Sequence, residues 1–479
     1  MAGPAASPAS RTEALTGALT GAPTGAPTAE LRDRPMVEPA ASPGSTMAAR
    51  TAEPMAAQTV EPTAAQTAEP MAARTEAPKT QQAALSRLIA TSVEEFATKH
   101  WGRQPVLTPA ADLPQGFTDL LDADAVDELV SERGLRTPFL RVARNGSTLG
   151  DSAFTAPGGV GATIGDQVSD DKLLRLFAEG ATLVLQALHR VWPPVIAFCQ
   201  QLAGDLGHPV QANAYVTPPQ NQGFRNHYDV HDVFVLQISG QKRWMIHEPV
   251  HPAPLRHQPW TDHRRSVERR SAEPPIIDAV LSPGDCLYLP RGFLHAATAL
   301  GGVSTHLTIG IHSWTRYAAA DLLLQQALRT AAADLEFRAA LPLGVDVTDP
   351  GQIGDDVATV KRALIEAIQA VGADTLAAAW APGARSTQRA APLGPLRQLR
   401  TVADLDQTTV LRVRPHLDAT ITSRPDGGLD VASRAGTVTI APSDQDAFRH
   451  WWRSGEAVAG DLGVPLATSL LLAGLAVAE

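Results

Sequence analysis

Two histidines and one aspartate have the residue types and spacing of an iron site. His227 and Asp229 stand two residues apart in NHYDVHDVFVLQISGQKRW, and His295 follows in GDCLYLPRGFLH. Residues two apart in a strand project to the same face, so one strand could bring the first pair to a metal and a neighbouring strand could bring His295. Two imidazoles and one carboxylate bind one face of iron(II) and leave the opposite face open, as in non-haem iron oxygenases. The pattern predicts such a centre.

The iron interpretation depends on the sequence around these three residues, because an isolated His-x-Asp pair usually lies on a polar surface. A turn at 283–285, the strand CLYLP and a loop opened by Arg291 would present His295. His231 shares the alternation of the first pair and competes for a ligand role. We expect His231 to hydrogen-bond a ligand or to lie at the rim of the site.

Lys242 follows Asp229 by 13 residues, in the motif GQKRW. A lysine in a hairpin is usually exposed, but apolar neighbours favour a partly buried strand here: Leu236, Ile238, Trp244 and Ile246. A buried ammonium group needs a fixed anion. The distal carboxylate of 2-oxoglutarate, held on iron by its other end, would supply that anion.

The composition narrows the class of protein. The chain has 479 residues, of which 44% are hydrophobic, so it can bury a large core in more than one domain. Its formal net charge of −10 does not favour binding to nucleic acid. Two cysteines, Cys199 and Cys286, exclude a disulfide scaffold and suit a reducing cytosol. No apolar run of about 18 residues and no secretory pattern is present, so we expect a cytoplasmic protein without a membrane span.

Residues 1–80 are of low complexity, with octads such as TAEPMAAQ and TVEPTAAQ. A segment of alanine, threonine and proline without large apolar residues buries too little apolar surface to offset the conformational entropy lost on folding. This composition predicts a disordered tail. The alternative is a tether or docking segment. Met47, Met55 and Met71 leave open a start later than residue 1.

Strand patterns dominate from Pro138 to Trp314. A helical interruption is expected over 171–206, broken at Pro193-Pro194. Strands are expected at 210–216, 229–238, 241–247, 285–290 and 303–313. Short strands in this order predict a double-sheet jelly roll, which is the cupin-type barrel.

The pattern becomes helical after Trp314, at 318–340 and 357–371, and a linker is expected over 382–397. The last 80 or so residues alternate short strands and helices in an order consistent with a small winged-helix-like module. Residues 401–479 contain ten Asp and Glu against six Arg, a balance of −4 that is wrong for phosphate binding. We therefore expect no direct nucleic-acid binding.

The chain resembles the JmjC-type 2-oxoglutarate oxygenases, in the ribosomal-oxygenase branch of the cupin superfamily. The likeness covers residue 84 to the end and is strongest in ANAYVTPPQNQGFRNHYDVHDVFVLQISGQKRW and LSPGDCLYLPRGFLHAATA, with EFATKHWGRQPVL upstream. It implies a mainly β double-stranded β-helix (jelly-roll, cupin, JmjC) core, an α-helical dimerisation region and a C-terminal winged-helix-like α+β module. The expected domains are the tail 1–80, the catalytic domain 81–315, the dimerisation region 316–385 and the C-terminal module 390–479.

The resemblance also implies roles for individual residues. His227, Asp229 and His295 would bind Fe(II), and Lys242 would pair with the distal carboxylate of 2-oxoglutarate. The remaining cosubstrate-pocket positions are Asn213, Tyr215, His306 and Thr308. The implied reaction consumes O2 and 2-oxoglutarate, gives succinate and CO2, and hydroxylates an arginine or histidine side chain of a protein or peptide, such as a ribosomal protein. A homodimer without membrane contact is implied.

Two other functions remain open from the sequence. The same oxidant could remove an N-methyl group, because a hydroxylated N-methyl carbon gives an unstable hemiaminal. Alternatively, the chain could be a cupin that binds metal without turnover and serves as a scaffold, although Lys242 beside a full triad argues against this. The arginine-rich segment 257–270 would be either a solvated loop or part of the substrate entrance. The sequence does not identify the substrate.

Overall fold

The computed structural model describes residues 83–478 except 145 and 162. The chain divides into two units, Met1–Ala68 and Glu69–Glu479, and all described residues belong to the second. The disordered tail expected for residues 1–80 therefore lies outside the described residues. No helix in the described part is long and apolar enough to cross a membrane.

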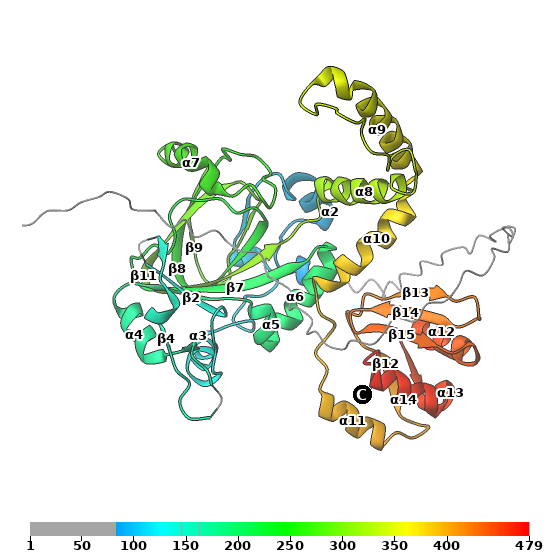
Figure 1. Cartoon of the computed structure of the whole chain (residues 1–479). Coiled ribbons are helices and arrows are strands. Elements are labelled where there is room, and N and C mark those ends of the chain that lie inside the picture. The colour runs from blue at the N-terminus through cyan, green and yellow to red at the C-terminus, as the bar shows by residue number, and fades with distance from the viewer. Residues whose placement is uncertain (1–82, 145, 162, 479) are drawn as a thin grey trace, which may run out of the picture. The chain divides into compact units, whose positions relative to one another are not determined.

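A nine-stranded antiparallel sheet forms the centre of the chain (Figure 1). Its order is β1-β10-β8-β11-β7-β6-β2-β3, with β9 paired to β8. The strands are β1 (Val106–Thr108), β2 (Leu140–Arg144), β3 (Ser147–Thr148), β6 (Thr182–Leu185), β7 (Val210–Thr217), β8 (Asp232–His247), β9 (Ile277–Leu281), β10 (Cys286–Leu289) and β11 (Leu294–Ile311). A separate pair joins β4 (Thr155–Ala156) to β5 (Gln167–Val168). The antiparallel jelly-roll core predicted from the strand pattern is confirmed.

The long strands β8 and β11 pair along almost their whole length and hold the sheet together. The sequence predicted two strands separated at residues 239–240, but β8 is continuous. Gly240 has φ +63°, and a Cβ there would lie 2.1 Å from the carbonyl oxygen of Val303. The register of β11 against β8 shifts beside this point, between Leu300 and Thr305. Glycine and an irregular register thus bend the strand without ending it.

The expected helical stretch 171–206 contains a strand that the sequence analysis missed. It divides into α4 (Asp170–Ala178), β6, α5 (Leu188–Val191) and α6 (Pro193–Leu206). All four residues of β6 are buried, between β2 and β7. A short apolar run buried on both faces has no alternation that would distinguish it from a helix. The break at Pro193-Pro194 is confirmed, because this pair begins α6.

Helices from the N-terminal part cover one face of the sheet and close the main hydrophobic core. These elements are α1 (Ala83–Ser86), α2 (Val93–Glu95), η1 (Phe96–His100), η2 (Ala110–Asp112), α3 (Ala123–Asp127), η3 (Glu128–Glu132) and η4 (Asp151–Ala153). Side chains cap two of them: Ser92 accepts from the amide of Glu95, and Asp122 accepts from that of Ala125. Between β8 and β9 lie η5 (Trp260–His263) and α7 (Arg264–Ser271).

Four helices follow the sheet: α8 (Arg316–Ala331), α9 (Pro350–Ala370), α10 (Ala373–Ser386) and α11 (Pro395–Ala403). The linker expected from residue 382 begins too early, because Pro382 lies inside α10. The rest forms two three-stranded sheets with their own hydrophobic core around Phe448, Trp451 and Leu470. Its elements are β12 (Val410–Val413), β13 (Thr420–Ser423), β14 (Leu429–Ser433), β15 (Gly436–Ile440), η6 (Pro442–Asp444), α12 (Gln445–Ser454), β16 (Glu456–Val458), α13 (Ala459–Leu462), α14 (Val464–Leu472) and β17 (Ala476–Ala478).

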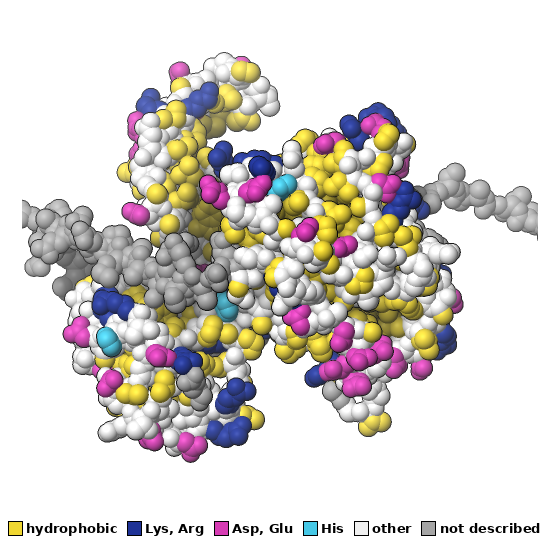
Figure 2. Space-filling view, turned by 180° about the vertical axis from the view of Figure 1, so that it is seen from behind, with side chains coloured by type: hydrophobic (Ala, Val, Ile, Leu, Met, Phe, Trp, Pro, Cys, Tyr) yellow, Lys and Arg dark blue, Asp and Glu magenta, His cyan; other side chains and the backbone are white. Residues whose placement is uncertain are grey.

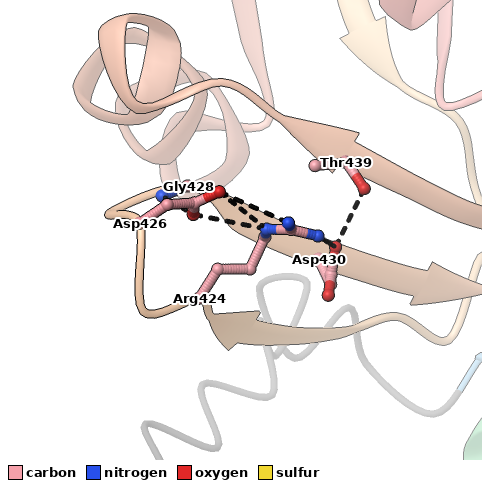
Figure 3. A network of polar contacts seen from close by, with 5 residues as sticks. All are labelled: Arg424, Asp426, Gly428, Asp430 and Thr439. Atoms are coloured by element: carbon pink, nitrogen blue, oxygen red, sulfur yellow. Dashed lines mark hydrogen bonds and ion pairs between the residues drawn. The ribbon is translucent and has the colours of Figure 1, made fainter. Parts of the chain in front are cut away.

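A turn at 426–428 joins β13 to β14 and carries a polar network (Figure 3). The Arg424 guanidinium lies 3.3 Å from carboxylate oxygens of both Asp426 and Asp430. Asp430 also accepts a 2.9 Å hydrogen bond from Thr439 on β15, which joins all three strands of this sheet. These groups are exposed, so the network fixes the turn geometry more than it adds stability.

Candidate metal centre

The three predicted metal-binding residues meet at one point. Each offers one ligand atom, and these atoms lie within 4.8 Å of one another. His227 and His295 form an isolated antiparallel bridge: the amide of His295 donates to the carbonyl of His227 at 2.8 Å, and the reverse bond is 3.2 Å. The two imidazole centroids are therefore only 4.4 Å apart. Asp229 completes the group, with Oδ2 3.8 Å from His295 Nε2.

The first two triad residues precede β8, although the sequence predicted that Asp229 begins a strand over 229–238. His227 and Asp229 lie in the irregular segment before Asp232, where the bridge to His295 and a 3.0 Å bond from the amide of Gly292 to the carbonyl of Asp229 hold them. The predicted loop after β10 leads into β11 and presents His295 as the second residue of that strand.

Backbone carbonyl groups orient both imidazole rings. His227 Nδ1 lies 2.7 Å from the carbonyl oxygen of Arg225, and His295 Nδ1 lies 3.1 Å from that of Phe293. A carbonyl oxygen only accepts, so each Nδ1 carries the proton and donates. Nε2 of each neutral ring is then left with a free lone pair, which is the form that binds a metal ion.

The electrostatics of the site favour a neutral His295 beside an ionised Asp229. Burial and the neighbouring His227 lower the pKa of His295 to about 4. Burial alone would raise the pKa of Asp229, but His231, His295 and His227 outweigh it and hold that pKa below its usual range. At neutral pH, His295 therefore presents a nitrogen lone pair and Asp229 a negative charge.

His231, the competitor for a ligand role, lies beside the triad and is not part of it. The metal-binding cluster within the described residues comprises His227, Asp229 and His295 alone. His231 stacks on His312 with ring centroids 5.2 Å apart. The ring also fills the space above Gly310, where a Cβ would lie 2.7 Å from it. The His231 side chain therefore packs against His312 and Gly310, next to Asp229.

The triad borders a small cavity of about 70 Å³ inside the barrel. This metal cavity is lined by Thr182, Tyr215, Gly223, Phe224, His227, Asp229, Val233, Val235, Lys242, Trp244, His295, Ala296, Ala297, His306 and Thr308. Of the residues predicted for the cosubstrate pocket, only Asn213 is missing from this lining. The Asn213 side chain accepts from the amide of Ala187 at 3.0 Å and bonds the hydroxyl of Tyr215. Asn213 therefore positions Tyr215, which lines the cavity, without lining the cavity itself.

Lys242 reaches the metal cavity from β8 and is only 4% exposed. Its Nζ donates to Thr217 Oγ1 at 3.1 Å and lies 3.4 Å from Nδ1 of His306. The ion pairs of the described residues include no carboxylate partner for it. Burial without an anion lowers the pKa of Lys242 to about 7. His306 is fixed beside it by stacking on Tyr215, with centroids 4.9 Å apart.

Trp244 and Thr217 belong to this site and were not assigned to it from the sequence. Trp244 lines the metal cavity, and its buried Nε1 donor has no acceptor among the described residues. Its spacing of two from Lys242 on β8 was the available signal, since both side chains project to one face. Lys242 and Trp244 together present two donors to the cavity without a protein anion to receive them.

Asp232 holds the strand end next to the triad and is 1% exposed. It accepts from the amide of Arg291 at 2.8 Å, the hydroxyl of Tyr288 at 3.3 Å and that of Ser313 at 3.3 Å. Asp232→Ala leaves these buried donors without their acceptor, so we expect a loss of about 3 kcal/mol in the free energy of unfolding. Urea denaturation followed by tryptophan fluorescence measures it.

Asp278→Ala is the matched control, because Asp278 pairs with Arg243 at 2.6 Å on the surface. It should cost less than about 1 kcal/mol. Equal losses in the two variants would contradict the structural role of Asp232.

Comparisons with known proteins agree with this site. Residues 194–319 match the family described as "JmjC domain". The bifunctional lysine-specific demethylase and histidyl-hydroxylase NO66 of Aedes aegypti is 29% identical over 259 residues, which are 53% of this chain and 39% of that protein. Ribosomal oxygenase 1 of Rattus norvegicus is 35% identical over 176 residues, 35% of this chain and 28% of its own. The chain thus spans less than half the length of these relatives.

Among solved structures, the Escherichia coli ribosomal oxygenase YcfD aligns with 81% of this chain and 98% of its own, at 18% identity and a TM-score of 0.48. The JmjC match includes the whole triad and Lys242. The part of the chain that carries the site is therefore similar to JmjC domains, and these relatives include ribosomal oxygenases, the branch that its motifs resemble.

Proposed function

We propose that this protein is an Fe(II)- and 2-oxoglutarate-dependent oxygenase that hydroxylates a side chain of a protein or peptide. The observation that carries the proposal is the convergence of the triad and an unpaired buried lysine, Lys242, on one cavity. A metal site alone would need no buried cation opposite to it.

The donor set fits iron(II). Two imidazole nitrogens with free lone pairs and one carboxylate oxygen form the facial set typical of non-haem iron(II), with positions left for other ligands. His227, Asp229 and His295 would hold the ion. When bound with 2-oxoglutarate, iron(II) activates O2 and supplies the oxidant that inserts oxygen into a C–H bond, with succinate and CO2 as coproducts.

The opposite end of the cavity fits a carboxylate. The Lys242 ammonium group would pair with the distal carboxylate of 2-oxoglutarate, and the free Nε1 of Trp244 offers a second donor. Thr217 and the stacked pair of Tyr215 and His306 fix the direction of the lysine. Apolar side chains such as Val233 also line the cavity and limit the access of water, which strengthens the pairing.

We propose that the substrate is a protein side chain, and that the hydroxylated residue is an arginine or histidine, such as one in a ribosomal protein. The support is the similarity to relatives with such an activity, since NO66 of Aedes aegypti is named a histidyl-hydroxylase. The same name includes a lysine-specific demethylase, which keeps N-methyl demethylation as a second candidate. A scaffold without turnover is less consistent with an uncompensated lysine, which costs stability unless an anion binds.

We further propose that residues 316–385 form a homodimer contact and that residues 390–479 act as a winged-helix-like protein-contact module. The support for the first is the exposed apolar surface of α8 and α9, which includes Leu324 (49% exposed) and Ile365 (56% exposed). The support for the second is its separate core and its −4 charge balance. A cytoplasmic location remains a prediction from the cysteine content.

The test is 2-oxoglutarate turnover by the full chain with iron(II) and ascorbate. We expect succinate formation that requires iron(II), and a slow uncoupled rate without substrate that rises when a substrate protein is added. Mass spectrometry of that protein separates the two activities, because hydroxylation adds an oxygen atom and demethylation removes a methyl group. Absence of succinate from iron-loaded protein would refute the oxygenase and leave the scaffold.

A further inference from the structure

A second cavity, of about 630 Å³, lies on the other face of the strands that carry the active site. We call it the α3–α4 groove. It is lined by residues of α3, η3 and α4 together with Leu183, Val216, Val303 and Thr305 of the sheet. Val216 and Thr305 line the groove, whereas their chain neighbours Tyr215 and His306 line the metal cavity. Successive side chains of a strand point to opposite faces, so the groove receives nothing that reacts at the metal.

The groove has an apolar floor and an apolar lip. Val126, Leu173 and Leu183 form its floor and are 2–7% exposed. At the lip, Leu174 is 69% exposed and Val303 is 43% exposed. Large apolar side chains beside a cavity mark a surface that gains free energy when an apolar group covers it.

Four carboxylates surround this apolar floor: Asp127, Glu132, Asp170 and Asp171. All four are exposed. None of them is in an ion pair of the described residues. Figure 2 shows acidic side chains gathered beside apolar surface in the region of α3 and α4. Asp170 and Asp171 lie in the first turn of α4, where the helix dipole favours a carboxylate, and no cation of the described residues is paired with any of the four. The groove therefore has an acidic rim around an apolar centre.

Nearby cations do not neutralise the rim. Lys172 donates to the carbonyl groups of Ser152 and Thr155, at 3.2 Å and 2.6 Å. Arg133 pairs with Glu128, outside the groove. Glu132 also ends η3, where a carboxylate opposes the helix dipole, so helix stability does not account for it.

We infer that the α3–α4 groove binds a basic segment of a partner protein, with one or two apolar side chains on the floor and flanking Lys or Arg residues against the rim. The inference rests on the proposed function, because the partner is the protein substrate, held here at a distance from the residue that is oxidised. Such a site contributes to the affinity for the substrate and not to the chemical step, so its loss raises KM and leaves kcat unchanged.

The test uses the full chain and a fluorescein-labelled peptide with two leucines flanked on each side by lysine and arginine. Binding is followed by fluorescence anisotropy at low salt. The double variant Asp127→Asn/Asp171→Asn should weaken binding about fivefold, and Leu174→Ser should do so by a similar factor. Both variants change exposed side chains, so the fold is retained, which circular dichroism verifies.

Asp355→Asn/Asp356→Asn on α9 is the control, since it removes the same formal charge far along the chain. It should leave the peptide affinity within twofold of the unmodified chain. Peptides with glutamate in place of the basic residues, or serine in place of leucine, should bind at least about fivefold more weakly.

Equal effects of the groove and control variants, or equal binding of the three peptides, would overturn the inference. So would tighter probe binding after deletion of residues 1–82, or probe binding that falls as the protein self-associates, because the groove would then be occupied by this chain or a second copy. Asp229→Ala should bind the probe normally. If the unmodified chain forms no succinate but still binds the probe, the proposed oxygenase function is refuted and the proposed peptide binding in the groove is not.

Discussion

Replacement of His227 by alanine should reduce iron-dependent succinate formation by more than about 100-fold, because mutation of groups that merely support a metal ligand already costs 10–100-fold. Asp229→Ala should have an effect of the same size. In each variant two ligands remain, and two donors no longer fix one face of an iron(II) ion. Succinate release at saturating 2-oxoglutarate, together with iron binding by calorimetry, measures both losses.

A binding measurement separates the ligand role from a structural one. Iron(II) should raise the melting temperature of the unmodified chain, since it binds only the folded state, and should not raise that of His227→Ala. The metal-free proteins should melt within a few degrees of each other, because the lost imidazole gives up a local hydrogen bond, from His227 Nδ1 to the carbonyl oxygen of Arg225. His450→Ala, at an exposed site on α12, is the control for a lost imidazole. Turnover by His227→Ala at the unmodified rate would defeat the ligand assignment.

The second large effect is expected at Lys242. Lys242→Met should raise the KM for 2-oxoglutarate by about 100-fold, because a buried charge-assisted contact of about 1.5–3 kcal/mol is lost and the carboxylate is left unpaired. The same variant should melt at a higher temperature than the unmodified chain when both lack 2-oxoglutarate. Methionine has a similar shape and relieves the cost of a buried ammonium group. A lower melting temperature would mean that Lys242 is a structural residue.

The pH dependence follows from the same lysine. Its pKa is lowered to about 7 by burial, against 10.5 ordinarily, so the unfolded chain holds this proton more tightly. The stability cost of Lys242 is therefore complete below pH 7 and disappears as the pH rises toward 10.5. Methionine should stabilise the protein most at or below pH 7.

The affinity for 2-oxoglutarate should also depend on pH, because it requires the protonated form of Lys242. Above pH 7 the empty site loses its proton, so the affinity for 2-oxoglutarate should fall by up to about tenfold per pH unit. Lys242→Arg keeps its charge at these pH values and should remove the dependence, even if its affinity is lower. An unchanged slope in the arginine variant would assign the titration to another group.

The convergence of the triad followed from the sequence because its determinants are local. His227 and Asp229 are two residues apart, and the turn, the strand and the loop that lead to His295 follow one another directly in the sequence. The cavity was harder to predict, because its wall is assembled from β6, β7, β8 and β11. The sequence pattern predicted Trp244 as a buried strand residue. Whether its Nε1 has an acceptor depends on side chains from other strands, which the local sequence does not specify.

Element boundaries failed where tertiary packing decided between two local options. Gly240 could have ended a strand, and the pairing of β8 with β11 carries the strand through it. The apolar run of β6 fits a helix or a buried strand equally, and only the neighbours β2 and β7 decide. Pro382 would break an isolated helix, yet α10 continues through it. In each case the missing information was a contact partner distant in sequence.

The paired backbone bonds between His227 and His295 have a consequence for metal exchange. Because main-chain hydrogen bonds set the separation of the two rings, chelation should empty the site without unfolding the barrel, and reloading should be rapid and reversible. A frame fixed in advance by the chain selects weakly among divalent ions of similar size, whose intrinsic affinities follow the Irving–Williams order. The ion carried in a cell would then reflect which metals that cell keeps available.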